Sequence, residues 1–145
     1  MTARIVGAGL LYFALTFGAG FALGPIRILL LEPRLGVRVA ELLELPVLIG
    51  VTFLAARWVV GRLAVPPRPG PRLGMGAFAA ALLLAAEFTF VLNLRGLTLE
   101  EYFAARDPVS GSAYYASVLL LALMPLLVNR SRAVPSPSAG VRRRP

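Results

Sequence analysis

Four long apolar runs dominate the chain, and short segments rich in charge, proline or glycine separate them. The runs cover residues 5–24, 39–60, 74–94 and 108–128. An α-helix needs about 20 apolar residues, at 1.5 Å rise each, to cross the hydrocarbon of a bilayer. The pattern therefore predicts an all-α polytopic membrane protein with four transmembrane helices, which form a single four-helix bundle within residues 1–128.

The first run, "IVGAGLLYFALTFGAGFALG", contains no charged residue. A cleaved signal peptide is the alternative, because Arg4 precedes the run and small residues lie near its end. The run is longer than the apolar part of a usual signal peptide, and three more runs follow it. A membrane span is therefore favoured, and small residues spaced four apart, such as Gly20 and Gly24, predict close helix packing.

The segments between the runs predict one further helix. Residues 61–74, "GRLAVPPRPGPRLG", contain four prolines and should form an extended turn. Thr98 and Glu101 have the spacing of a capping box, and one face of the segment 98–106 is mostly apolar. We expect a short interfacial helix there, lying on the membrane surface. Asp107 and Pro108 suit the start of the fourth span as its cap and first residue.

The composition argues against an enzyme. Hydrophobic residues make up 58% of the 145 residues, and the chain has neither cysteine nor histidine. Disulfides, thiolate metal sites and the commonest general base are therefore excluded. No phosphate loop, dinucleotide fingerprint or nucleophile elbow occurs in the sequence. We therefore predict no catalytic residue, no metal site and no cofactor.

The net charge of +8 comes from 15 arginines, which flank the apolar runs. This arrangement indicates membrane topology rather than a nucleic-acid partner. Ten arginines lie on the side of the termini and the Pro-rich turn, and five lie on the other side. By the positive-inside rule, both termini should face the cytoplasm of a bacterial inner membrane. The tail 129–145, "NRSRAVPSPSAGVRRRP", should be a disordered basic cytoplasmic segment.

Three carboxylates interrupt the apolar runs. Glu41 and Glu44 lie near the outer end of the second span, and Glu87 lies in the third. A charge at the centre of a span costs about 2.5–3.5 kcal/mol on insertion scales. Nine Leu, Phe or Val residues between 74 and 94 return roughly 3–5 kcal/mol on the same scale. Glu87 is thus compatible with a span, but it should face the bundle and find a partner.

The depth of these carboxylates predicts a charge cluster in the outer leaflet. Arginines beyond the first span and before the second should reach the same level. The candidate intramembrane cluster is Arg27, Arg34, Arg38, Glu41, Glu44 and Glu87. Two interpretations remain open: buried charges that fix helix neighbours, or a site for a substrate, proton or ion.

Four stretches together resemble a known family. They are "FALGPIRILLLEPRLG", "AELLELP", "AARWVV" and "LEEYFAARDPVSG", and the resemblance extends from Tyr12 to Val128. The family consists of small bacterial four-span inner-membrane proteins that have no assigned activity. The resemblance therefore implies location and layout, and no functional residue can be transferred from it.

Our leading hypothesis is a non-enzymatic assembly or accessory membrane protein. Besides the lipid bilayer, its expected partner is a second copy or another membrane protein. The alternative is a small transporter or proton-coupled permease that uses Glu44 and Glu87. A transporter needs a polar path to both faces, and the inner halves of the spans have no acid, which favours the first hypothesis.

Overall fold

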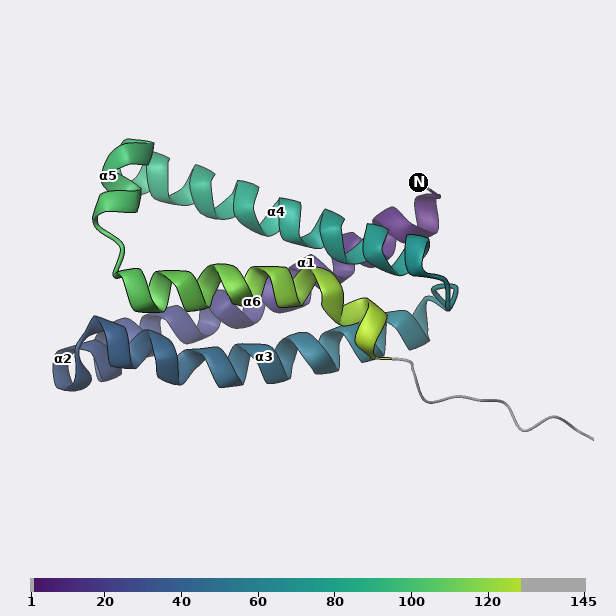
Figure 1. Cartoon of the computed structure of the whole chain (residues 1–145), viewed down its shortest axis with the longest axis horizontal. Coiled ribbons are helices and arrows are strands. Elements are labelled where there is room, and N and C mark those ends of the chain that lie inside the picture. The colour runs from purple at the N-terminus through teal and green to yellow at the C-terminus, as the bar shows by residue number, and fades with distance from the viewer. Residues whose placement is uncertain (1, 129–145) are drawn as a thin grey trace, which may run out of the picture.

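The computed structural model describes residues 2–128, and all regular structure in this range is helical (Figure 1). Within these residues, four continuous helical segments are long and apolar enough to cross a membrane. This confirms the predicted all-α class with four membrane-length helices. The predicted tail, residues 129–145, lies outside the described residues. The elements are α1 (Ala3–Ile26), the π-helix η1 (Arg27–Leu31), α2 (Glu32–Leu35), α3 (Val37–Arg62), α4 (Pro69–Arg95), α5 (Leu99–Ala104) and α6 (Pro108–Leu127).

The four long helices form a square bundle. Helices α1 and α6 each pack against both α3 and α4, and they lie on opposite corners. Figure 1 shows that α1 begins and α6 ends at one end of the bundle, whereas α2 and α5 lie at the other. We call these the termini end and the loop end.

The first helix is longer than the sequence analysis predicted. It does not stop at Gly24, because the chain continues through Pro25 and the π-helix η1 as one segment, Ala3–Leu35. Within η1 the N–H of Glu32 bonds to the carbonyl of Arg27, five residues earlier, which is the wide turn of a π-helix. The segment ends only at Gly36, whose φ of +78° suits glycine.

Small residues bring the helices together toward the termini end. A Cβ built on Gly76 of α4 would collide with the backbone carbonyl of Ala122 in α6. A Cβ on Gly9 of α1 would lie 2.7 Å from Cδ1 of Phe78 in α4. The helices therefore meet at backbone distance, as small residues permit in membrane bundles. The core at this end includes Ala8, Tyr12, Ala55, Ala56, Val59, Val60, Met75, Ala79, Leu121 and Met124.

Buried polar side chains of this core donate hydrogen bonds to backbone carbonyls of α6. Pro125 lacks the N–H that would otherwise bond to the carbonyl of Leu121. The hydroxyl of Tyr12 donates to that carbonyl instead, at 3.0 Å. The guanidinium of Arg72, which is 4% exposed, donates from Nη1 to the carbonyl of Pro125 at 3.3 Å. Polar atoms in this half thus satisfy acceptors that a proline and a helix end leave free.

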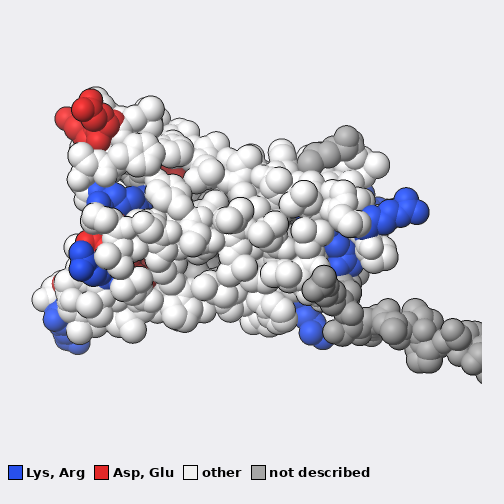
Figure 2. Space-filling view, in the orientation of Figure 1, with Lys and Arg blue, Asp and Glu red and all other residues white. Residues whose placement is uncertain are grey.

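Charged residues are distributed differently at the two ends. On the face shown in Figure 2, arginine lies at both ends, whereas acidic side chains lie only toward the loop end. A broad uncharged band separates the two ends. This is the distribution that a membrane-spanning bundle requires, because charge is costly in hydrocarbon.

Candidate functional site

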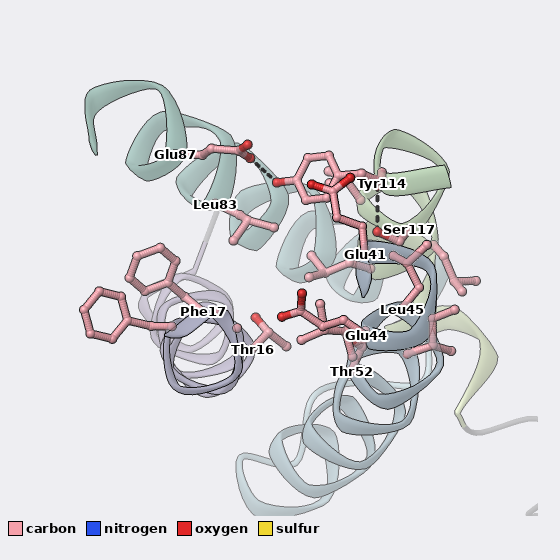
Figure 3. A pocket seen from close by; sticks show the side chains of 18 of the residues that line it. Thr16, Phe17, Glu41, Glu44, Leu45, Thr52, Leu83, Glu87, Tyr114 and Ser117 are labelled. Atoms are coloured by element: carbon pink, nitrogen blue, oxygen red, sulfur yellow. Dashed lines mark hydrogen bonds between the residues drawn. The ribbon is translucent and has the colours of Figure 1, made fainter. Parts of the chain in front are cut away.

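A cavity of about 340 Å³ lies among α1, α3, α4 and α6, in the half of the bundle toward the loop end (Figure 3). This is within the size range of small-molecule sites in proteins. Its walls are mostly apolar and aromatic, with a few charged and hydroxyl groups between them. The lining includes Thr16, Phe17, Gly20, Phe21, Arg27, Glu41, Glu44, Leu48, Thr52, Leu83, Glu87, Phe90, Arg106, Ser110, Tyr114 and Ser117.

One guanidinium at the cavity faces three carboxylates. Arg27 Nη1 lies 3.2 Å from Glu41 Oε1, and its Nε lies 3.4 Å from both Glu44 Oε2 and Glu32 Oε1. Arg27 Nε is buried and has no hydrogen-bond partner among the described residues. We call these four residues the Arg27 cluster. With all its carboxylates ionised, the cluster carries two negative charges in excess.

The backbone explains how the Arg27 cluster forms. Because the first helix continues past Pro25, Arg27 stays on the helix instead of entering a loop. Gly36 then reverses the chain, so that α3 returns beside η1. Glu41 and Glu44 are three residues apart and therefore share the face of α3 that lines the cavity.

A second cluster lies on the opposite wall and is balanced. The carboxylate of Glu87 on α4 accepts hydrogen bonds from Tyr102 at 2.5 Å, from Arg106 Nη1 at 2.9 Å, and from the hydroxyl of Tyr114. The guanidinium of Arg106 also lies over the ring of Tyr114, 4.4 Å from its centroid, and near those of Tyr102 and Tyr115. Three donors, one of which is the cation Arg106, thus satisfy one carboxylate. We call Glu87, Tyr102, Arg106 and Tyr114 the Glu87 cluster.

A third ion pair lies outside the cavity, at the loop end. Arg38 Nη2 and Nε approach Asp107 Oδ1 at 2.7 and 3.0 Å, which links α3 to the start of α6. Asp107 also caps α6 by accepting from the backbone N–H groups of Val109 and Ser110. The hydrogen bond from Arg38, followed by that from the Ser110 backbone, holds the pKa of the Asp107 carboxyl well below its usual range.

The six predicted cluster residues do not form one cluster. Arg27, Glu41, Glu44 and Glu87 all line the cavity, but Glu87 pairs with Arg106 and not with Arg27. Arg38 pairs with Asp107 instead of with the glutamates. Arg34 takes part in none of the ion pairs within residues 2–128.

The sequence analysis missed part of the site. The predicted charge cluster leaves out Arg106 and Tyr102, yet Tyr102 is 8% exposed and both side chains donate hydrogen bonds to Glu87. Tyr114, which also bonds to Glu87, is likewise absent from the predicted cluster. A usable signal was the short connection between the third and fourth spans. Because this connection is short and Arg106 comes just before the fourth span, its side chain should lie close to the membrane level of Glu87.

Comparison with protein-family models, with curated proteins and with solved structures gave no match. The resemblance to small four-span inner-membrane proteins therefore stays an expectation. Within the part of the chain that the structure describes, no group of three or more Asp, Glu, His or Cys side chains is placed to hold a metal ion.

The two charged clusters differ in what they can bind. The Glu87 cluster has its charge balanced and its carboxylate fully bonded, so it is suited to holding α4, α5 and α6 together. The Arg27 cluster has an excess of acceptors and negative charge next to an open volume. It can accept a proton or a cationic group that enters the cavity.

Proposed function

We propose that this chain is a non-enzymatic accessory protein of the bacterial inner membrane, which binds a small ligand in its cavity. The observation that carries the proposal is the position of the charges. Carboxylates and arginines from three of the four spans, and from the segment before α6, line a single cavity inside helices of membrane length. Ionisable groups at such depth are expensive, and they mark functional sites by default.

The proposed orientation follows from the arginines. Ten of the 15 belong to the side of the termini, so both termini lie in the cytoplasm and the loop end faces the periplasm. The cavity then lies in the periplasmic half, and the core around Tyr12 and Met75 closes the bundle below it. Helix α5 lies at the outer surface in this arrangement, with its exposed Leu99 and Phe103 in the headgroup region.

The proposed role as an accessory protein includes a partner, which is a second copy or another membrane protein. Ligand binding at the loop end would alter the contacts of α5 and α2, which are the parts of the bundle outside the four-helix core.

The experiment that tests this proposal is one-sided thiol labelling. The chain has no cysteine, so each variant carries a single new thiol. Ser117→Cys in the cavity should react with a membrane-impermeant maleimide in cells whose outer membrane is permeable. Gly70→Cys, at the exposed start of α4, should react only after the inner membrane is opened. Gly18→Cys, exposed on the outside of α1, should react poorly in both cases because it faces lipid.

Two results would overturn the proposal. One is a Ser117→Cys thiol that stays unreactive from both sides in the folded protein, because the cavity would then be closed to water-borne reagents. The other is a Ser117→Cys thiol that reacts only from the cytoplasm.

A small transporter or proton-coupled permease is the second candidate. The excess of negative charge at Arg27 favours it, because Glu44 could carry a proton while Glu87 holds the opposite wall. Reconstituted vesicles under a pH gradient should then show solute-dependent proton flux that Glu44→Gln abolishes. Vesicles that show no flux across a broad panel of solutes would remove this candidate.

A further inference from the structure

We infer that the ligand of the cavity is an amphipathic organic cation, an ammonium group joined to an apolar body, with the ammonium at Glu41 and Glu44. The inference rests on the proposed function, because it takes the cavity as a binding site. It adds the chemical class of the ligand and the place of its charge.

The charge of the lining decides the sign of the ligand. The Glu87 cluster is balanced by Arg106 and saturated by three donors. At the other wall, Arg27 is shared among three carboxylates. The uncompensated charge in the cavity is therefore negative, and it lies at Glu41 and Glu44.

Glu44 is the clearest sign of a missing partner. Its side chain is 10% exposed, the lowest value among the three carboxylates around Arg27. It accepts no hydrogen bond from the described residues, although Oε2 lies 3.4 Å from Arg27 Nε. Figure 3 shows its carboxylate extending from α3 across the cavity toward α1. A buried carboxylate without donors is costly, and an ammonium supplies three donors and a compensating charge.

The rest of the cavity suits an apolar body. Phe17, Phe21 and Phe90 are among its lining residues, and Phe21 and Phe90, which are about half exposed or more at its rim, meet edge to face with centroids 6.3 Å apart. A volume of about 340 Å³ corresponds to roughly eleven groups of water size, at about 30 Å³ each. Octylammonium, with nine heavy atoms, is therefore a suitable probe.

The first test compares three probes of the same chain length on the full-length protein in maltoside micelles. Octylammonium should raise the unfolding temperature in a saturable manner. Octanol and octyl sulfate at the same concentrations should not, because they lack the positive charge. Equal stabilisation by octanol or octyl sulfate would overturn the inference.

The second test removes the site in two independent ways. Glu44→Gln should weaken octylammonium binding at least about tenfold, because an amide cannot compensate the charge. Glu100→Gln, the same change at an exposed position on α5, should leave binding unchanged. If Glu44→Gln does not fold, Gly20→Leu keeps every charge and fills the cavity. A Cβ there meets only Leu48 Cδ2, at 3.9 Å. Gly18→Leu, on the exposed side of α1, is its control.

A third measurement identifies the source of the ammonium, because an aminophospholipid headgroup and a free amine share this chemistry. Native mass spectrometry should show one retained phosphatidylethanolamine, displaced by octylammonium, if the ligand is a lipid. Binding of octylammonium without retention of phosphatidylethanolamine over phosphatidylglycerol indicates a free amine. Either result supports the inference.

Octylammonium binding that survives both Glu44→Gln and Gly20→Leu would overturn the inference of a cationic ligand. If Ser117→Cys is labelled from the periplasmic side but octylammonium does not bind, the cation inference fails and the proposed binding function stands. If Ser117→Cys is inaccessible, the proposed function fails first.

Discussion

The same four helices build two different structures along their length. Toward the termini end, residues such as Ala8, Ala56 and Met75 are completely buried, and helices touch through glycine. Toward the loop end, the helices surround a cavity lined by phenylalanine, leucine and charge. Tyr12 and Arg72 of the first half satisfy backbone carbonyls of α6, whereas Glu41 and Glu44 of the second half line an open volume. One half is therefore closed by packing, and the other leaves an open volume between the same helices.

Side-chain size explains why the halves differ. In α4, Gly76 allows α6 to approach to backbone distance, whereas Leu83 and Glu87 further along the same helix line the cavity. Figure 1 shows α4 and α6 close together toward the termini end and further apart toward α5. Small residues allow dense packing in membranes, and bulky or charged residues hold helices apart.

The largest expected effect on stability comes from replacing glycine by alanine, and the two halves of the bundle should respond differently. Gly76→Ala should lower the free energy of unfolding by about 3 kcal/mol, because the added methyl meets backbone and must push α6 away. Gly20→Ala should change it by less than about 1 kcal/mol, since the new methyl has room and alanine favours a helix. Denaturant titration in maltoside micelles measures both. Equal losses in the two variants would refute the contrast in packing.

Removing the cation of the Arg27 cluster should have the next largest effect. Arg27→Gln leaves three neighbouring carboxylates without a cation, and we expect a loss of about 2 kcal/mol. Combining it with Glu44→Gln should restore part of the stability, because one of the repelling charges is gone. Arg34→Gln is the matched control, since Arg34 forms no ion pair within residues 2–128, and it should be close to neutral. The absence of coupling in the double variant would contradict the cluster.

The hydrogen bond from Tyr12 to the carbonyl of Leu121, in the half toward the termini end, should contribute less to the free energy of unfolding. Tyr12→Phe leaves the carbonyl of Leu121 buried without a donor and should cost about 1.5 kcal/mol. Adding Pro125→Ala returns an N–H to that carbonyl, so the double variant should recover most of the loss. The same titration measures it. A double variant no more stable than Tyr12→Phe would show that the hydroxyl has a different role.

The smallest effect concerns the ion pair outside the cavity. The pKa of Asp107 is lowered in the folded protein, so its contribution to stability is present above the unfolded pKa, about 3.9. That contribution should be lost as the pH falls below this value toward the folded pKa. The difference in unfolding free energy between the parent and Asp107→Asn should therefore be constant from pH 8 to pH 5 and shrink below pH 4. A difference that changes between pH 8 and pH 5 would contradict this assignment.

Local features of the fold could be predicted from the sequence. The apolar runs indicated the four long helices, and the capping box of Thr98 and Glu101 is present in α5. Asp107 caps α6, as expected from its position before Pro108. These features depend on residues a few positions apart, which a sequence displays directly.

Features that depend on how helices turn toward one another could not be predicted. The spacing of small residues favoured Gly20 and Gly24 as contact points, yet the close approaches occur at Gly9 and Gly76. The partner of Glu87 was sought among the arginines near the second span, but Arg106 fills that role. A helix rotated by one residue presents a different face, and the length of an apolar run does not fix that rotation.

The most direct test of the two-half account is water contact in the unmodified protein. Water-edited solid-state NMR in lipid bilayers measures how quickly magnetisation passes from water to each residue. The account predicts fast transfer to Gly20, Glu44 and Ser117, which line the cavity, and slow transfer to Ala8, Ala56 and Met75, which form the closed core. Equal transfer rates for the two groups, or faster transfer to the core, would contradict it.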